Sequence, residues 1–145
     1  PLTEENYIPF YSVYSMIFGP DAAPLFEGRS ILVVNHLPEP KIEGLRIAFK
    51  ERGVARSQFI SIRPDKALFQ NLDLALVDGD VDLVLVGAGC GAAPMTEQLR
   101  PLKAVVIDAG FAIDAMAKPE ARWTRAFCVP DSEFDASRVK FRTFD

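Results

Sequence analysis

The chain has 145 residues, of which 49% are hydrophobic and 25% charged, and a formal net charge of −4. This composition is typical of a single folded domain and excludes a disordered chain, a membrane span and a basic surface for nucleic acid. The two cysteines and one histidine are too few for a disulfide framework or a Cys/His metal cluster, so reduced thiols and a cytoplasmic location are expected. Because the chain starts at Pro1 and not at methionine, it is interpreted as a processed chain or a piece of a longer protein.

An aromatic helix is predicted at the start of the chain, from Leu2 to Phe18. Its aromatic residues recur at helical spacing on one face, and they are Tyr7, Phe10, Tyr11, Tyr14 and Phe18. This face is interpreted as core packing; the alternative is a surface that docks on a neighbouring domain or on a second copy of the chain. The prolines and the glycine between Pro20 and Arg29 predict a connecting loop.

From Ser30 onward, short apolar runs alternate with amphipathic segments. The apolar runs predict buried strands at 30–35, 58–62, 82–86 and 103–107, and the other segments predict helices at 40–52, 65–76, 94–99 and 112–117. This alternation predicts a Rossmann-like α/β fold, a three-layer sandwich with a short, mostly parallel sheet of about four strands. One domain is expected over 1–145, with a helix in 1–19, the α/β core in 30–117 and an extension in 118–145 that adds an edge strand or wraps the sheet.

Candidate site residues follow the predicted strands, because ligands of parallel sheets bind beyond the carboxyl ends of the strands. Asn35 and His36 end or follow the first strand, Arg63 follows the second, and Asp108 follows the fourth. His36 and Asp108 are the candidate catalytic residues, as general acids or bases. Asn35 and Arg63 are candidates for contacting a ligand. For each of them the alternative is a purely structural or solvated side chain.

The third strand is followed by a glycine-rich loop with Gly87, Gly89 and Gly91. Three interpretations stay open: a tight strand-to-helix turn, a loop that binds a nucleotide or sugar phosphate, and a dinucleotide site. The dinucleotide fingerprint is matched by Gly87-x-Gly89-x-x-Ala92 with Asp108 as the ribose-binding acid, which would imply NAD or FAD. The short helix after this loop and the late position of the motif count against that third interpretation.

The run from Asp82 to Ala117, DLVLVGAGCGAAPMTEQLRPLKAVVIDAGFAIDAMA, resembles the closing part of the GT-D fold glycosyltransferases. The shared elements are an apolar strand, a glycine-containing loop, a helix and a strand that ends in Ile107-Asp108-Ala109-Gly110, with Asp114 as a further acid. Upstream, the first predicted strand and the stretch ISIRPDKALF also look similar to that family.

The resemblance implies a sugar transferase that uses a nucleoside-diphosphate sugar, with Gly87, Gly89 and Gly91 facing the donor. In that family an Asp-x-Glu motif near the start of the domain engages a divalent metal, so Mg²⁺ or Mn²⁺ is the implied cofactor. This chain has no such motif before its first strand, and Asp131-Ser132-Glu133 matches only in the C-terminal extension. It also has Phe111 where the family tends to carry histidine. No metal ligand is therefore assigned, and a non-catalytic interaction module of a larger protein is the alternative function.

Overall fold

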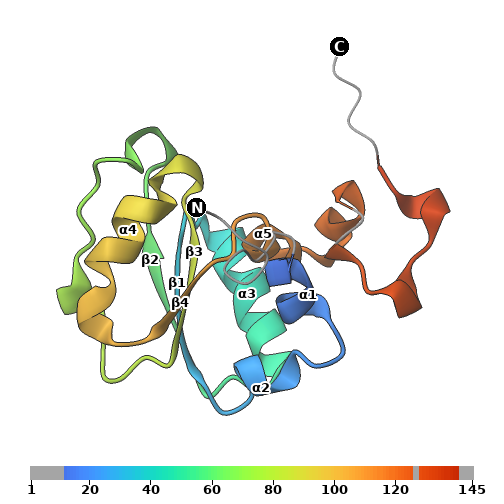
Figure 1. Ribbon diagram of the computed structural model, residues 1–145, viewed down its shortest axis with the longest axis horizontal. Coiled ribbons are helices and arrows are strands. Elements are labelled where there is room, and N and C mark those ends of the chain that lie inside the picture. Colours follow the sequence, from blue (N-terminus) through green and yellow to red (C-terminus); the bar gives the residue numbers. More distant parts are fainter. Residues whose placement is uncertain (1–11, 126–127, 141–145) are drawn as a thin grey trace, which may run out of the picture.

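Four strands form one all-parallel sheet with the order β2-β1-β3-β4. The computed structural model describes residues 12–125 and 128–140 (Figure 1). The strands are β1 (Ser30–Asn35), β2 (Arg56–Ser61), β3 (Leu83–Gly87) and β4 (Val105–Asp108). The predicted α/β class and strand number are confirmed, with strand ends displaced by up to two residues.

Helices cover both faces of the sheet, as a three-layer sandwich requires (Figure 1). The helices α1 (Ser12–Phe18), α3 (Glu39–Glu51) and α5 (Ala112–Ala117) lie on one side, and α4 (Ala92–Gln98) lies on the other. Successive residues of a strand point to opposite faces, so Ile31 and Val33 join the first core cluster while Leu32 and Val34 join the second. This explains why β1 is apolar at every position from Ile31 to Val34.

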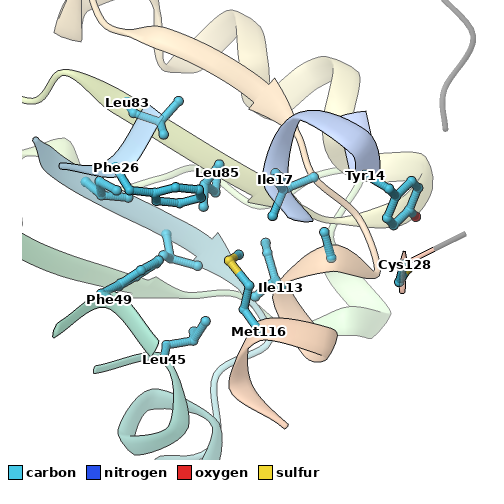
Figure 2. Packing of buried hydrophobic residues seen from close by; sticks show 14 of the residues in the cluster. Tyr14, Ile17, Phe26, Leu45, Phe49, Leu83, Leu85, Ile113, Met116 and Cys128 are labelled. Atoms are coloured by element: carbon cyan, nitrogen blue, oxygen red, sulfur yellow. The ribbon is translucent and has the colours of Figure 1, made fainter. Parts of the chain in front are cut away.

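The aromatic face of the first predicted helix packs into the core where the structure describes it. Tyr14 is buried in the cluster that contains Ile17, Phe49 and Met116, and Phe18 packs against that cluster. Figure 2 shows Tyr14 and Ile17 on the same helix, with Cys128 beside the Tyr14 ring. The other aromatic residues of this face lie outside the described residues, namely Tyr7, Phe10 and Tyr11.

The predicted helix over 65–76 is wrong. The segment forms two separate 3₁₀ turns, η1 (Pro64–Lys66) and η2 (Leu74–Leu76), joined by irregular backbone. Side chains supply the hydrogen bonds that a helix would otherwise make: the Gln70 side chain accepts from the Arg63 backbone N–H, and Gln98 of α4 accepts from the Leu72 N–H. Such side-chain hydrogen bonds compete with helix formation.

Two further segments differ from their sequence-based expectations. The predicted loop before β1 contains a short helix, α2 (Ala23–Phe26), which places Phe26 in the core. The extension after α5 forms 3₁₀ turns, of which the longest is η5 (Pro119–Thr124), and in its described part it adds no strand to the sheet. Instead it buries Trp123 and Cys128 on the side of α1 and α5.

Over residues 12–125 and 128–140, no helix has the length and apolar character needed to cross a membrane.

Candidate functional site

The strand order changes direction between β1 and β3. From β1 the chain moves to β2 on one side, and then returns past β1 to β3 on the other side. Parallel sheets bind their ligands beyond the carboxyl ends of the strands at such a change of strand order, and we call this part of the molecule, beyond the ends of β1 and β3, the strand-end edge. Asn35 and Gly87 end these two strands and lie opposite each other in the register.

A polar network lies at this strand-end edge. The side chain of Asn35 is buried, with an exposed fraction of 5%, and its Nδ2 donates to the Gly87 carbonyl oxygen at 2.8 Å. Its Oδ1 accepts from Lys41 Nζ at 3.1 Å, and Lys41 Nζ also pairs with Asp114 Oδ1 at 2.6 Å. The network therefore joins β1, β3, the first turn of α3 and the first turn of α5.

Lys41 has hydrogen-bonding capacity beyond its partners among the described residues. An ammonium group has three N–H donors, and within residues 12–125 and 128–140 Asn35 and Asp114 are its partners. The Lys41 side chain is 18% exposed, so it lies at the border between the core and the surface.

The three glycines of the loop after β3 have three different structural roles. A Cβ at Gly87 would overlap Asn35 Nδ2 and lie 2.8 Å from Ile113 Cδ1, so this glycine makes room for the Asn35 hydrogen bond. Gly91 is buried against the backbone of Ala67, where a Cβ would lie 2.6 Å from the Ala67 carbonyl oxygen. Gly89 has a φ of +54° and is exposed, with no atom within 4 Å of a Cβ position. Of the three, Gly89 therefore offers its backbone most openly to a ligand.

Asp108 ends β4 on the other side of the glycine loop. Partial burial raises the pKa of its carboxyl, and the backbone N–H of Gly110 acts in the opposite direction. A Cβ at Gly110 would lie 4.0 Å from Asp108 Oδ1 and 3.7 Å from Tyr14 Oη, so these two side chains flank the same loop. The Arg125 guanidinium lies 4.5 Å from the centre of the Phe111 ring and also acts on the Tyr14 hydroxyl. A carboxyl with a raised pKa at the end of a strand is suited to exchange a proton with a ligand.

Arg63 and His36 lie at the same edge of the sheet but outside the network. The Arg63 guanidinium forms a bidentate pair with Asp65, at 3.2 Å from Nε and 2.9 Å from Nη2. His36 is exposed directly after β1. The structure therefore brings Asn35 and Gly87 into contact and leaves His36 and Arg63 at the periphery.

The loop after β2 presents apolar side chains that the sequence analysis did not select. Leu68 and Phe69 are 50% and 87% exposed. Their loop is held in place, because Ala67 packs on Gly91 and the Gln98 side chain donates to the Gln70 carbonyl oxygen at 3.1 Å. An exposed phenylalanine on an anchored loop beside the glycine loop provides a stacking surface for a planar ligand group.

The implied divalent metal does not fit the described residues. In the described part of the chain, no group of three or more His, Cys, Asp or Glu side chains could hold a metal ion. Asp114 is engaged by Lys41, and Glu133 of the C-terminal Asp-x-Glu match pairs with Arg122 at 3.4 Å.

Sequence reasoning missed Lys41 because it interpreted the helix after β1 only for its apolar face. A lysine in the first turn of that helix, six residues after a buried asparagine, was the available signal. Phe69 was missed because it was assigned to a helix.

Comparisons of the chain with protein-family models, with curated proteins and with solved structures found no match.

Proposed function

We propose that this protein binds a nucleoside-diphosphate sugar at the strand-end edge, beyond the carboxyl ends of β1 and β3, as a glycosyltransferase-like domain. The observation that carries the proposal is the network of Asn35, Lys41 and Asp114, which lies at the change of strand order beside the open backbone of Gly89. Its cation, Lys41, is linked through Asn35 to Gly87, where the glycine loop begins, and an anion such as a phosphate is attracted by a lysine and can approach a glycine backbone closely.

The surrounding groups suit the other parts of such a ligand. Asp108 can accept hydrogen bonds from sugar hydroxyls, and the exposed ring of Phe69 can stack on a base. In the proposed transfer, the Asp108 carboxylate takes the proton of the acceptor hydroxyl while the hydroxyl oxygen attacks the anomeric carbon of the donor sugar. The bond from that carbon to the diphosphate breaks and the nucleoside diphosphate leaves. The raised pKa of Asp108 makes it a stronger base than an ordinary aspartate.

The proposal is tested by titrating the protein with UDP- and dTDP-sugars and with free UDP, following heat release and melting temperature. A ligand that binds only the native state raises the melting temperature, and we expect dissociation constants of about 1 mM or tighter. Lys41→Met should weaken binding by about 10-fold or more, whereas Lys50→Met, which changes an exposed lysine near the other end of α3, should leave it unchanged. Absence of binding by every nucleotide sugar contradicts the proposal.

A second candidate function is favoured by the position of Asp108. The glycine loop follows β3, α4 follows the loop, and Asp108 ends the adjacent strand β4. This is the strand, helix and strand context in which the dinucleotide fingerprint binds a ribose. Stabilisation by NAD or FAD, together with no response to nucleotide sugars, would favour this function over the first.

A further inference from the structure

A cavity lies near the start of β1, at the edge of the sheet opposite to the one that Asn35 and Gly87 occupy. It has a volume of about 500 Å³, which is within the range of small-molecule sites. Its walls come from the end of α1, from α2 and from the end of α3. The apolar lining residues are Ile17, Phe18, Ala22, Ala23 and Phe26, and the charged ones are Glu27, Glu51 and Arg52. Because strands of one parallel sheet run the same way, this cavity near the start of β1 is separate from the strand-end edge beyond Asn35.

The Arg52 guanidinium is held in a fixed position in the wall of this cavity. Its Nη1 donates to the Ile17 carbonyl oxygen at 3.0 Å and contacts Met116 Sδ at 3.6 Å. Its central carbon lies 4.8 Å from the centre of the Phe26 ring and 5.6 Å from that of Phe18. Figure 2 shows Ile17, Phe26 and Met116 from three helices converging on this part of the core. Aromatic contacts and hydrogen bonds of this kind orient a guanidinium before any ligand arrives.

Arg52 has unused hydrogen-bonding capacity. A guanidinium has five N–H donors, and the side-chain hydrogen bonds of Arg52 to described residues all come from Nη1. The edge formed by Nε and Nη2, which matches a carboxylate in bidentate geometry, has no partner among residues 12–125 and 128–140. Within the same residues Arg52 forms no ion pair.

The charges around Arg52 favour an additional anion. Burial lowers the pKa of Arg52 and Arg122 lowers it further, while Glu51 acts in the opposite direction. A partly buried cation without an ion-pair partner is costly, and a carboxylate on its free edge would offset that cost. Glu27 and Glu51 are exposed residues of the lining and form no ion pair with the described part of the chain. They disfavour a purely anionic ligand and can accept a cationic group.

We propose that this cavity binds a small zwitterion with an apolar side chain, of the class of a free apolar α-amino acid. The ligand carboxylate pairs with Nε and Nη2 of Arg52, and the ammonium group faces Glu27 and Glu51. The hydrocarbon part lies on Phe18, Ala22 and Ala23, which are the partly or fully exposed apolar residues of the lining. Such a molecule complements the cationic, the acidic and the apolar parts of the lining at once.

The test uses calorimetric titration of the full chain with L-phenylalanine and L-leucine. We expect both to bind, 3-phenylpropanoate to bind more weakly because it lacks the ammonium group, and phenethylamine to bind most weakly because it lacks the carboxylate. Arg52→Gln should reduce the affinity by about 10- to 100-fold, as loss of a charge-assisted pair predicts. Arg46→Gln, which changes an exposed arginine of the same helix, should have no effect.

A second variant keeps the test valid if Arg52→Gln does not fold. Ala23→Leu adds bulk at an exposed position of the cavity lining and keeps Arg52, so it should fold and lose the ligand. Absence of binding by both amino acids to the wild type overturns the proposal, as does unchanged binding by Ala23→Leu and Arg52→Gln. Nucleotide-sugar binding at the strand-end edge is measured separately and is independent of either result.

Discussion

Asn35 Nδ2 donates a hydrogen bond of 2.8 Å to the carbonyl oxygen of Gly87, a residue 52 positions later in the chain. This contact ties the ends of the two central strands together at the edge proposed as the ligand site. A side chain at position 87 would occupy the place of the Asn35 amide. The glycine and the asparagine are therefore structurally dependent on each other.

Gly87→Ala should lower the free energy of unfolding by about 1–3 kcal/mol, since it forces extra volume into a packed core. The measurement is urea denaturation of the variant and the wild type. In the double variant Asn35→Ala/Gly87→Ala the losses should be less than additive, because one of the two overlapping groups is gone. A Gly87→Ala variant as stable as the wild type would contradict the close approach.

Gly44→Ala is expected to destabilise the protein, against the usual preference for alanine in a helix. Alanine gains about 0.5–1 kcal/mol over glycine inside a helix. At Gly44, however, a Cβ would overlap the Ala117 carbonyl oxygen, where α3 packs on α5. Because both groups belong to rigid helices, we expect a net loss of about 1 kcal/mol or more in the same denaturation experiment. Lys50→Ala at an exposed position of α3 is the control and should leave stability nearly unchanged.

The two cysteines should react at very different rates. Cys90 is exposed in the glycine loop and Cys128 is buried in the core. Burial raises the pKa of the Cys128 thiol to about 11 from its ordinary 9.0, and the thiolate is the reactive form. We expect a thiol reagent to modify one cysteine in the native protein and two after unfolding, with Cys90→Ala removing the native reaction. Rapid reaction of both thiols in the folded protein would refute this assignment.

The raised pKa of Cys128 also predicts a loss of stability in alkali. A native-state pKa above the unfolded value means that the protonated thiol contributes stability below pH 9.0, and that this contribution disappears as the pH rises through about 11. Unfolding measured over this interval should show a steeper decline for the wild type than for Cys128→Ala. Parallel curves would show that Cys128 does not ionise in this range.

Asp108 should make the free energy of unfolding depend on pH in the acidic range. Its carboxyl has a pKa raised above the ordinary 3.8 by partial burial, so the native state holds this proton more tightly than the unfolded state does. The stability that the protonated form contributes is complete below pH 3.8 and is lost as the pH rises through the native pKa. The difference in unfolding free energy between Asp108→Asn and the wild type should grow over that interval and then stay constant. A difference independent of pH would contradict the raised pKa.

Much of the fold was predictable from local patterns. The strand Ser30–Asn35 and the helix Ala112–Ala117 are found at their predicted bounds. An unbroken apolar run favours a buried strand, and a short run of helix-forming residues after a glycine favours a helix. The segment from Pro64 to Leu76 was not predictable in this way. Its backbone is held by the side chains of Gln70 and Gln98, and the second of these comes from a helix that lies later in the sequence.

The candidate site was predictable in outline only. Asn35, the glycine loop and Asp108 follow from the rule that ligands bind at the carboxyl ends of parallel strands. The partners of Asn35 depend on strand order, which local patterns do not contain. Lys41 and Asp114 meet only because α3 and α5 pack on the same face of the sheet. Likewise, the distinct packing of Gly87, Gly89 and Gly91 depends on which residues lie opposite each glycine.

The most direct test of the proposed function is a titration of ¹⁵N-labelled protein with a UDP-sugar, followed by backbone amide resonances. The account predicts that the shifted amides cluster at residues 35–41, 87–91 and 108–114, around the network of Asn35, Lys41 and Asp114. It also predicts that Lys41→Met reduces these shifts at a given ligand concentration. Shifts confined to other parts of the protein, or no shifts at saturating nucleotide sugar, would contradict a donor site at this edge of the sheet.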